Sequence, residues 1–284
     1  MTEDTIPINI MQDICKFKDK TFVIKYGGSI MKNTAAQNAF IEDISDLVNE
    51  GINIVIVHGG GPEITKWLDK SGVENKFING LRVTDNATME IVEMVLSGSV
   101  NKKLVANLNL RNLKALGLSG RDCKLITAKK KYTYENNEKI DIGFVGEVTK
   151  VNHELLYDLI NKKYIPVISP IGCDDEGNTY NINADFVASA IASELKADKL
   201  IILTDIEGVY SDINDKSSLI KSISVSEIKA LIKDGTIKGG MIPKMECCME
   251  AVQSGTNNVH LIDGRKEHSI IIDTFTNCGT KITA

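Results

Sequence analysis

Continuous apolar runs alternate along the chain with stretches whose apolar residues recur every three or four positions. The runs are typical of strands buried on both faces of a sheet, and they cover residues 22–26, 52–58, 165–169, 199–204 and 259–263. Helical spacing covers residues 35–49, 62–68, 86–96, 100–116, 152–161, 185–195, 225–233 and 239–254. Because strands and helices alternate, the pattern predicts an α/β fold with a mostly parallel sheet and helices on both faces.

The pattern is weaker between residues 117 and 150. Short strands are predicted around 124–128 and 144–148, and the polar segment 129–139 is most simply a solvated hairpin. Residues 8–20 form an amphipathic lead-in with helical spacing. Since no repeat, linker or low-complexity segment interrupts the sequence, a single domain spanning residues 1–284 is predicted.

Composition narrows the classes of partner. The formal charge of the 284 residues is −5 without a basic tail, which disfavours nucleic acid and anionic membranes as partners. No apolar run is long enough to cross a bilayer, and the acidic N-terminus lacks a signal-peptide pattern. Six scattered cysteines without a Cys-x-x-Cys pair favour reduced thiols in the cytoplasm, and four dispersed histidines disfavour a metal cluster.

A lysine interrupts the first buried run. Lys25 lies within 22–26, where parallel strands normally carry apolar side chains only, and Gly27 and Gly28 follow it. The simplest alternative is a lysine whose ammonium extends out at the strand end. The adjacent glycines would allow a ligand to approach backbone N–H groups closely.

Three glycines, Gly59 to Gly61, follow the second buried run and precede a helical pattern. A strand, a glycine loop and a helix N-terminus together form a common anion-binding arrangement. A tight turn is the alternative, although one glycine would suffice for it. Arg82 lies in the next loop, where its guanidinium could bind a carboxylate bidentately or form an ordinary surface ion pair.

Polar segments lie between the later apolar runs and the elements that follow them. Asn181-Ile-Asn-Ala-Asp185 opens a helix, Asp205-Ile-Glu-Gly-Val-Tyr210 follows a strand, and Gly239-Gly240-Met-Ile-Pro-Lys244 begins the last long helix. Lys25, the glycine loop, Asp185 and Asp205 are all predicted at carboxyl ends of strands, where α/β sheets bind ligands.

Two lysines, several glycine loops and a central acid suit phosphoryl transfer. These groups can hold phosphates and neutralise charge on a transferring phosphoryl group. The Walker P-loop, the Gly-x-Gly-x-x-Gly dinucleotide fingerprint and the Gly-x-Ser-x-Gly elbow do not occur at the expected places. An ionised carboxylate acceptor would need no general base, so positioning and charge stabilisation would determine the rate.

Six motifs in order carry a resemblance to a known family. They are Ile24-Lys-Tyr-Gly-Gly-Ser, Val57-His-Gly-Gly-Gly-Pro, Asn79-Gly-Leu-Arg-Val-Thr, Asn181-Ile-Asn-Ala-Asp, Thr204-Asp-Ile-Glu-Gly-Val and Gly240-Met-Ile-Pro-Lys. Together they resemble the amino acid kinase superfamily, and within it the acetylglutamate kinases of arginine biosynthesis. The resemblance implies a three-layer sandwich with an open, mostly parallel sheet of about eight strands. It also implies an N-terminal lobe, about 1–170, for the acyl substrate and the dimer, and a C-terminal lobe, about 171–284, for ATP.

The same resemblance implies roles for particular residues. Lys25 and Lys244 would stabilise the phosphoryl group passing from ATP to the side-chain carboxylate of N-acetyl-L-glutamate, and Asp185 would orient both lysines. The remaining roles are phosphate cradling by Gly27 and Gly28, substrate binding by Gly60, Gly61, Arg82 and Asn181, and nucleotide binding by Thr204, Asp205, Gly208 and Tyr210, with residues 236–238 also considered. Mg²⁺ would arrive with ATP rather than in a protein cage.

Regulation and assembly are open at this point. Family members inhibited by arginine carry an extra N-terminal helix that links dimers into hexamers, and residues 8–20 could be that helix. Their C-terminal signature is resembled by Phe275-Thr-Asn-Cys-Gly-Thr-Lys-Ile, which is two residues short. Alternatives are a sister kinase acting on acetylaminoadipate, the related carbamate, uridylate or aspartate kinases, and a non-catalytic arginine sensor.

Overall fold

An eight-stranded sheet runs through the chain, which we describe from a computed structural model of residues 8–28, 30–135, 138–276 and 278–284. Its strands follow in the order β14 (Ser222–Ser224), β16 (Thr280–Thr283), β15 (Val259–Asp263), β11 (Lys199–Thr204), β1 (Thr21–Tyr26), β2 (Asn53–His58), β8 (Ile165–Ser169) and β5 (Ala115–Ser119). Neighbouring strands pair in parallel except β15 with β16, among the pairings observed in the described residues. The predicted α/β class with a mostly parallel sheet of about eight strands is confirmed.

The chain divides into two compact units. The first joins the N-terminal segment up to Ile54 to Lys196–Ala284, and the second is Val55–Leu195. Both ends of the chain therefore build one unit, and its middle builds the other. The roles predicted for two lobes of 1–170 and 171–284 stay a prediction.

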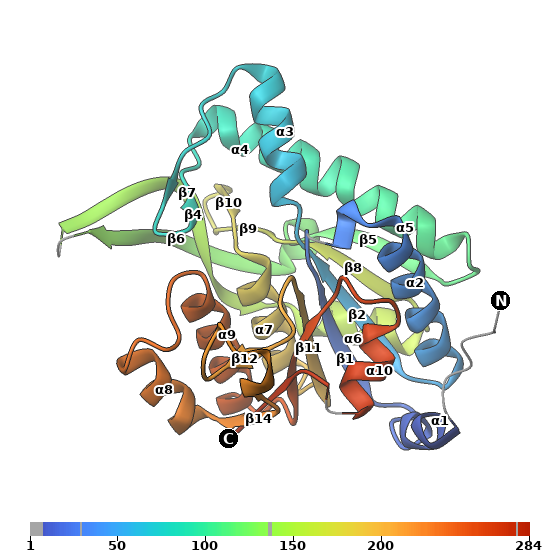
Figure 1. Ribbon diagram of the computed structural model, residues 1–284. Coiled ribbons are helices and arrows are strands. Elements are labelled where there is room, and N and C mark those ends of the chain that lie inside the picture. Colours follow the sequence, from blue (N-terminus) through green and yellow to red (C-terminus); the bar gives the residue numbers. More distant parts are fainter. Residues whose placement is uncertain (1–7, 29, 136–137, 277) are drawn as a thin grey trace. The chain divides into compact units, whose positions relative to one another are not determined.

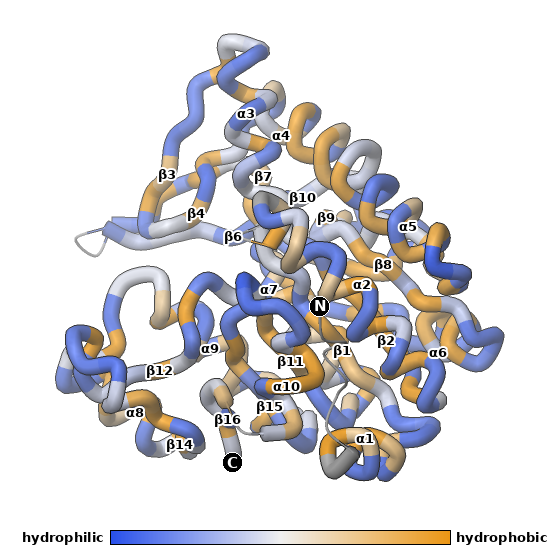
Figure 2. The backbone as a smooth tube through the Cα atoms, turned by 45° about the vertical axis from the view of Figure 1, so that its right-hand side comes forward, coloured by the Kyte–Doolittle hydropathy of each residue, from blue (hydrophilic) through white to orange (hydrophobic). Residues whose placement is uncertain are grey.

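In the first unit, helices pack against strands of the eight-stranded sheet, two of which are buried along their whole length. All six side chains of β11 and all five of β15 are buried, as the continuous apolar runs predicted. Figure 2 shows the hydropathy of each residue along the backbone. The helices are α1 (Ile8–Cys15), α2 (Thr34–Asn49), α8 (Val225–Lys233), α9 (Met241–Gln253) and α10 (Ser269–Thr276), with short 3₁₀ turns η1 (Ile30–Lys32) and η4 (Lys216–Ser218). Helix α10 contacts both α1 and α2 (Figure 1), and a small hairpin pairs β12 (Val209–Tyr210) with β13 (Leu219–Ile220).

The second unit combines helices with a small closed barrel. The barrel consists of β10 (Thr179–Asn181), β7 (Glu138–Val151), β6 (Ile126–Glu135) and β9 (Ile171–Cys173). The long β6–β7 hairpin extends away from the other barrel strands (Figure 1), which confirms the solvated hairpin predicted at 129–139. The remaining elements are α3 (Gly61–Ser71), β3 (Phe77–Ile78), β4 (Leu81–Arg82), α4 (Asn86–Glu93), the π-helix η2 (Met94–Val100), α5 (Asn101–Asn109), η3 (Asp122–Lys124), α6 (His153–Asn161) and α7 (Ala184–Glu194).

The helix predicted over 100–116 is wrong beyond Asn109. Asn112 has φ of +58°, a left-handed conformation that stops a helix. The side chain of Asn109 then accepts from the Ala115 N–H at 2.8 Å and donates to its carbonyl at 3.2 Å, which closes the turn. Leu116 consequently lies in β5, 37% exposed, instead of continuing the seam of Leu104 and Leu108.

Candidate active site

A pocket of about 320 Å³ lies in the first unit beyond the carboxyl end of β11. Its lining comes from the loop after β11, from the segment before α9 and from the loop after β15: Asp205, Ile206, Glu207, Gly208, Val209, Tyr210, Ile213, Lys216, Thr236, Ile237, Lys238, Met241 and Arg265. The sequence proposed the segments 204–210 and 236–238 for the nucleotide, and residues 205–210 and 236–238 of them line one pocket. Thr204 is buried at the end of β11 and is not a lining residue.

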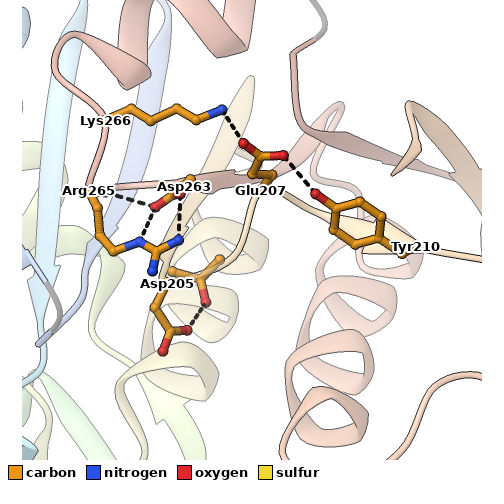
Figure 3. A network of polar contacts seen from close by, with 7 residues as sticks. Asp205, Glu207, Tyr210, Asp263, Arg265 and Lys266 are labelled. Carbon is orange, nitrogen blue, oxygen red and sulfur yellow. Dashed lines mark hydrogen bonds and ion pairs between the residues drawn. The ribbon is translucent and has the colours of Figure 1, made fainter. Parts of the chain in front are cut away.

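Two ion pairs hold the wall of this pocket in place (Figure 3). Lys266 Nζ lies 2.9 Å from Glu207 Oε1, and the Tyr210 hydroxyl donates to Glu207 Oε2 at 2.7 Å. These two contacts hold the pKa of Glu207 below its usual range, while burial and the bond to Glu207 raise the pKa of Tyr210 to about 12. Arg265 donates two hydrogen bonds to Asp263, from Nε to Oδ1 at 2.9 Å and from Nη2 to Oδ2 at 2.8 Å. These bonds hold the loop after β15 against the end of that strand.

The buried Thr280 holds the segment that follows β11 in place. Thr280 Oγ1, at the start of β16, accepts from the Val209 N–H at 2.8 Å and donates to the Ile220 carbonyl at 2.7 Å. A Cβ atom on Gly208 would lie 2.4 Å from this hydroxyl, so glycine permits the close approach. The position of β12 in the pocket wall therefore depends on a side chain about 70 residues away in the sequence.

The lysine predicted in the first strand is buried. Lys25 is 8% exposed in β1, and its Nζ would lie 3.4 Å from a Cβ on Gly27. That Cβ would also lie 2.8 Å from the Leu203 carbonyl oxygen, so Gly27 lets the end of β1 approach the end of β11. Gly28 follows directly. Lys244 lies in the first turn of α9 and belongs to the same unit.

The second unit brings Arg82 to the glycine loop. Gly60 caps α3 and Gly61 begins it, as the strand–glycine–helix pattern predicted. Arg82 is 8% exposed, and its Nη2 lies 3.2 Å from the Gly61 carbonyl oxygen and 3.0 Å from Thr65 Oγ1. Asn75 contacts its other terminal nitrogen, and the ring of Phe77 lies 4.7 Å from the guanidinium carbon. These contacts are to neutral groups, in contrast to the surface ion pair considered as the alternative.

A polar chain connects Asn181 to the same residue. Its side-chain nitrogen donates to Thr84 Oγ1 at 3.3 Å, and Thr84 donates to the Arg82 carbonyl at 2.9 Å. Asp185 is 4% exposed in the first turn of α7, whose N-cap Asn183 accepts from the Asp185 N–H at 2.8 Å. Asp185 follows the carboxyl end of β10 and lies at the start of a helix, as predicted, but this strand belongs to the barrel and not to the eight-stranded sheet.

The candidate residues thus form two sets, one in each unit. The first unit holds Lys25, Gly27, Gly28, Thr204, Asp205, Gly208, Tyr210 and Lys244, and the second holds Gly60, Gly61, Arg82, Asn181 and Asp185. Sequence reasoning missed Asp263, Arg265, Lys266 and Thr280 as site residues, and it included Glu207 only as part of the segment 204–210. The run 259–263 ends in Asp263 and is followed by Gly264 and Arg265, the same strand-end signal as in the others. Thr280 entered the sequence analysis only as part of the C-terminal segment Phe275–Ile282, and not as a site residue.

Within residues 8–28, 30–135, 138–276 and 278–284, no three histidine, cysteine, aspartate or glutamate side chains are grouped so that they could hold a metal ion. In the same residues, no helix is both long enough and apolar enough to span a membrane.

Comparison with known proteins identifies the family of this chain. Residues 20–263 match the model of the amino acid kinase family. The chain therefore belongs to the amino acid kinase family.

Its curated relatives are more specific. The acetylglutamate kinase of Clostridium acetobutylicum is 56% identical over 273 residues, covering 96% of this chain and 92% of the relative. That of Desulforamulus reducens is 54% identical over 274 residues, covering 96% and 94%. Among solved structures, N-acetylglutamate synthase from Neisseria gonorrhoeae superposes with a TM-score of 0.84 at 21% identity, over 97% of this chain and 62% of that one, which supports the fold.

Proposed function

We propose that this chain phosphorylates the side-chain carboxylate of N-acetyl-L-glutamate with ATP, a step of arginine biosynthesis. The observation that carries the proposal is the relationship to acetylglutamate kinases, at 56% and 54% identity over nearly the whole chain. The pocket formed by residues 205–210 and 236–238 supports it, since a volume of about 320 Å³ is within the usual range for small-molecule sites.

In the proposed reaction, a carboxylate oxygen of the substrate attacks the γ-phosphorus of ATP. The new O–P bond forms while the bond from the γ-phosphorus to the bridging oxygen breaks, and ADP leaves with that electron pair. The acceptor is ionised at neutral pH, so no base is required, and catalysis comes from positioning and charge stabilisation. MgATP is the nucleotide substrate, with Mg²⁺ bound mainly by its phosphate oxygens.

Each candidate residue has a part in this proposal. Lys25 and Lys244 neutralise charge that develops on the transferring phosphoryl group, and Asp185 orients both ammonium groups. Gly27 and Gly28 cradle phosphate. Burial of Lys25 and Asp185, at 8% and 4% exposure, supports these roles because fully buried charged residues need a specific reason.

The substrate contacts come from the second unit. Gly60 and Gly61 hold the acyl substrate through their amides, Arg82 binds the α-carboxylate and Asn181 binds the acetylamino group. The contacts that bring Arg82 to Gly61 and, through Thr84, to Asn181 support a shared site for one small acid. Asp205, Gly208 and Tyr210 line the nucleotide pocket, and Thr204 supports it from the end of β11.

A hydroxylamine trap tests the proposal directly. An acyl phosphate formed from ATP reacts with hydroxylamine to a coloured hydroxamate, so a panel of N-acetylglutamate, N-acetylaminoadipate, aspartate and carbamate distinguishes the related kinases. Acetylglutamate should give the highest kcat/KM, although one methylene changes binding by only about 1–3 kcal/mol. Absence of hydroxamate with every acid would contradict the proposal and favour an arginine sensor.

We also propose that the protein is cytoplasmic, that arginine inhibits it and that it assembles as a trimer of dimers. The helix α1 within residues 8–20 supports assembly through an N-terminal helix, and scattered cysteines support a reducing compartment. Light scattering with and without arginine tests the assembly, and the rate of phosphorylation with and without arginine tests the inhibition. A dimer whose rate arginine does not change would contradict them.

A further inference from the structure

A fully buried histidine directly precedes the glycine loop. His58 is the last residue of β2, is 0% exposed, and its Nδ1 lies 2.8 Å from the Gly59 carbonyl oxygen. Its Nε2 lies 3.2 Å from Asn101 Nδ2. Because a carbonyl only accepts, Nδ1 carries the hydrogen, and in a neutral ring Nε2 then accepts from Asn101.

The contacts of Asn101 support this assignment. Its Nδ2 also lies 2.8 Å from the Val167 carbonyl oxygen, so both hydrogens of the amide have acceptors. The opposite amide orientation would place an oxygen against that carbonyl. A third acceptor, the Leu118 carbonyl oxygen, lies 3.5 Å from Nδ2. In the part of the chain that the structure describes, no donor reaches the buried Asn101 Oδ1, so the contacts of Nδ2 determine the orientation. Burial lowers the pKa of His58 to about 4, which keeps the ring neutral.

The hydrogen bond to Gly59 has a consequence for Gly60. The peptide between them is planar, and no cis peptide occurs among the described residues, so its C=O and N–H point in opposite directions. With the Gly59 carbonyl held against the imidazole, the Gly60 N–H points away from it. The π-helix η2 packs against the loop as well, since a Cβ on Gly60 would lie 2.4 Å from Leu96 Cδ2. Single-turn π segments often lie at functional sites.

We propose that His58 is a positioning residue for the acyl substrate, because its Nδ1–H holds the Gly59 carbonyl and thereby directs the Gly60 N–H. The proposal rests on the proposed function, in which the Gly60 amide holds the substrate. His58 itself does not contact the substrate. The alternative is a core histidine that contributes only to stability.

Two substitutions separate these possibilities. In His58→Asn the amide nitrogen can occupy the place of Nδ1 and keep the bond to Gly59, whereas in His58→Gln it reaches toward Asn101 and leaves Gly59 without its donor. For acetylglutamate, kcat/KM should fall about ten-fold or more in His58→Gln and about three-fold or less in His58→Asn. The KM for ATP should stay within about two-fold of the unmodified protein in both. Leu156→Ala, at a fully buried position of α6, controls for lost stability without touching the loop.

A spectroscopic measurement does not depend on activity. A ¹³C–¹⁵N correlation spectrum of histidine-labelled protein contains the signals of four histidines. The signal that is absent from the spectrum of His58→Asn belongs to His58. The neutral Nδ1–H tautomer is expected. The Nε2–H tautomer, or equal kinetic losses in the two variants and in Leu156→Ala, would overturn the proposal. If the unmodified protein phosphorylates no acid but shows the Nδ1–H tautomer, the proposed function fails and the geometry of His58 stands.

Discussion

Replacing Thr280 by valine tests whether β16 positions the wall of the nucleotide pocket. The Thr280 hydroxyl joins Val209 in the pocket wall to Ile220 in β13 through bonds of 2.8 and 2.7 Å. Valine keeps the branched shape and removes both bonds. Thr280 and Val209 are 0% and 2% exposed, so water cannot readily replace the lost acceptor.

The expected magnitude follows from these two contacts. A hydrogen bond within a protein contributes about 0.5–1.5 kcal/mol, and leaving a buried partner unsatisfied costs about 1–3 kcal/mol. The free energy of unfolding should therefore fall by about 1–3 kcal/mol in Thr280→Val. Because Val209 and its neighbour Tyr210 line the pocket, the KM for ATP should rise as well, while the KM for acetylglutamate should change little.

Urea unfolding and steady-state kinetics measure both effects. Thr280→Ser keeps the hydroxyl and is the matched control, so it should retain most of the stability and the KM for ATP of the unmodified protein. If Thr280→Val changes the free energy of unfolding by less than about 0.5 kcal/mol and leaves the KM for ATP unchanged, the hydroxyl does not position the pocket wall.

Three further predictions concern the same unit. Asp43→Ala should lower the free energy of unfolding by about 3 kcal/mol, because the buried carboxylate accepts hydrogen bonds from a histidine and from two backbone amides at the start of α10. An unchanged midpoint of urea unfolding would refute this. Burial lowers the pKa of Lys199 from 10.5 to about 8 in the folded protein. Between pH 8 and 10.5 the unfolded chain therefore binds more protons at this lysine than the folded chain does. The free energy of unfolding consequently rises with pH, by no more than about 1.4 kcal/mol per pH unit. Lys199→Met should remove that rise in unfolding experiments between pH 8 and 10.5. Gly208→Ala should raise the KM for ATP by displacing Thr280, whereas Gly98→Ala, with nothing within 4 Å of the added methyl, should not.

Buried strands were predictable because their environment leaves a plain pattern. The runs 199–204 and 259–263 are mainly apolar since both faces of β11 and β15 are covered, and the structure confirms their bounds. Their polar residues are Lys199, Thr204, His260 and Asp263. The barrel was harder to predict. Strands β6 and β7 are half-exposed and carry many lysines, so the continuous apolar pattern is missing. The sequence predicted only two short strands, around 124–128 and 144–148, and the hairpin at 129–139.

The site was predictable where a glycine or a charge interrupts a buried pattern. Lys25, the glycine loop Gly59 to Gly61 and the polar segment 205–210 stand out for that reason. Contacts between distant segments carry no such local signal, as the bonds from Thr280 to Val209 and from Arg82 to Gly61 show. The end of α5 was missed because the left-handed Asn112 and the side-chain bonds of Asn109 close a turn within an otherwise helical spacing.

We propose that Lys25 and Lys244 act together, oriented by Asp185, on one phosphoryl group. A crystal structure of the protein with acetylglutamate, Mg²⁺ and a non-hydrolysable ATP analogue measures this most directly. We predict that both Nζ atoms lie within hydrogen-bonding distance, about 3.2 Å, of oxygens on or next to the γ-phosphate, and that the Asp185 carboxylate contacts both ammonium groups. Ammonium groups on separate surfaces, with the γ-phosphate held by other residues, would contradict the account.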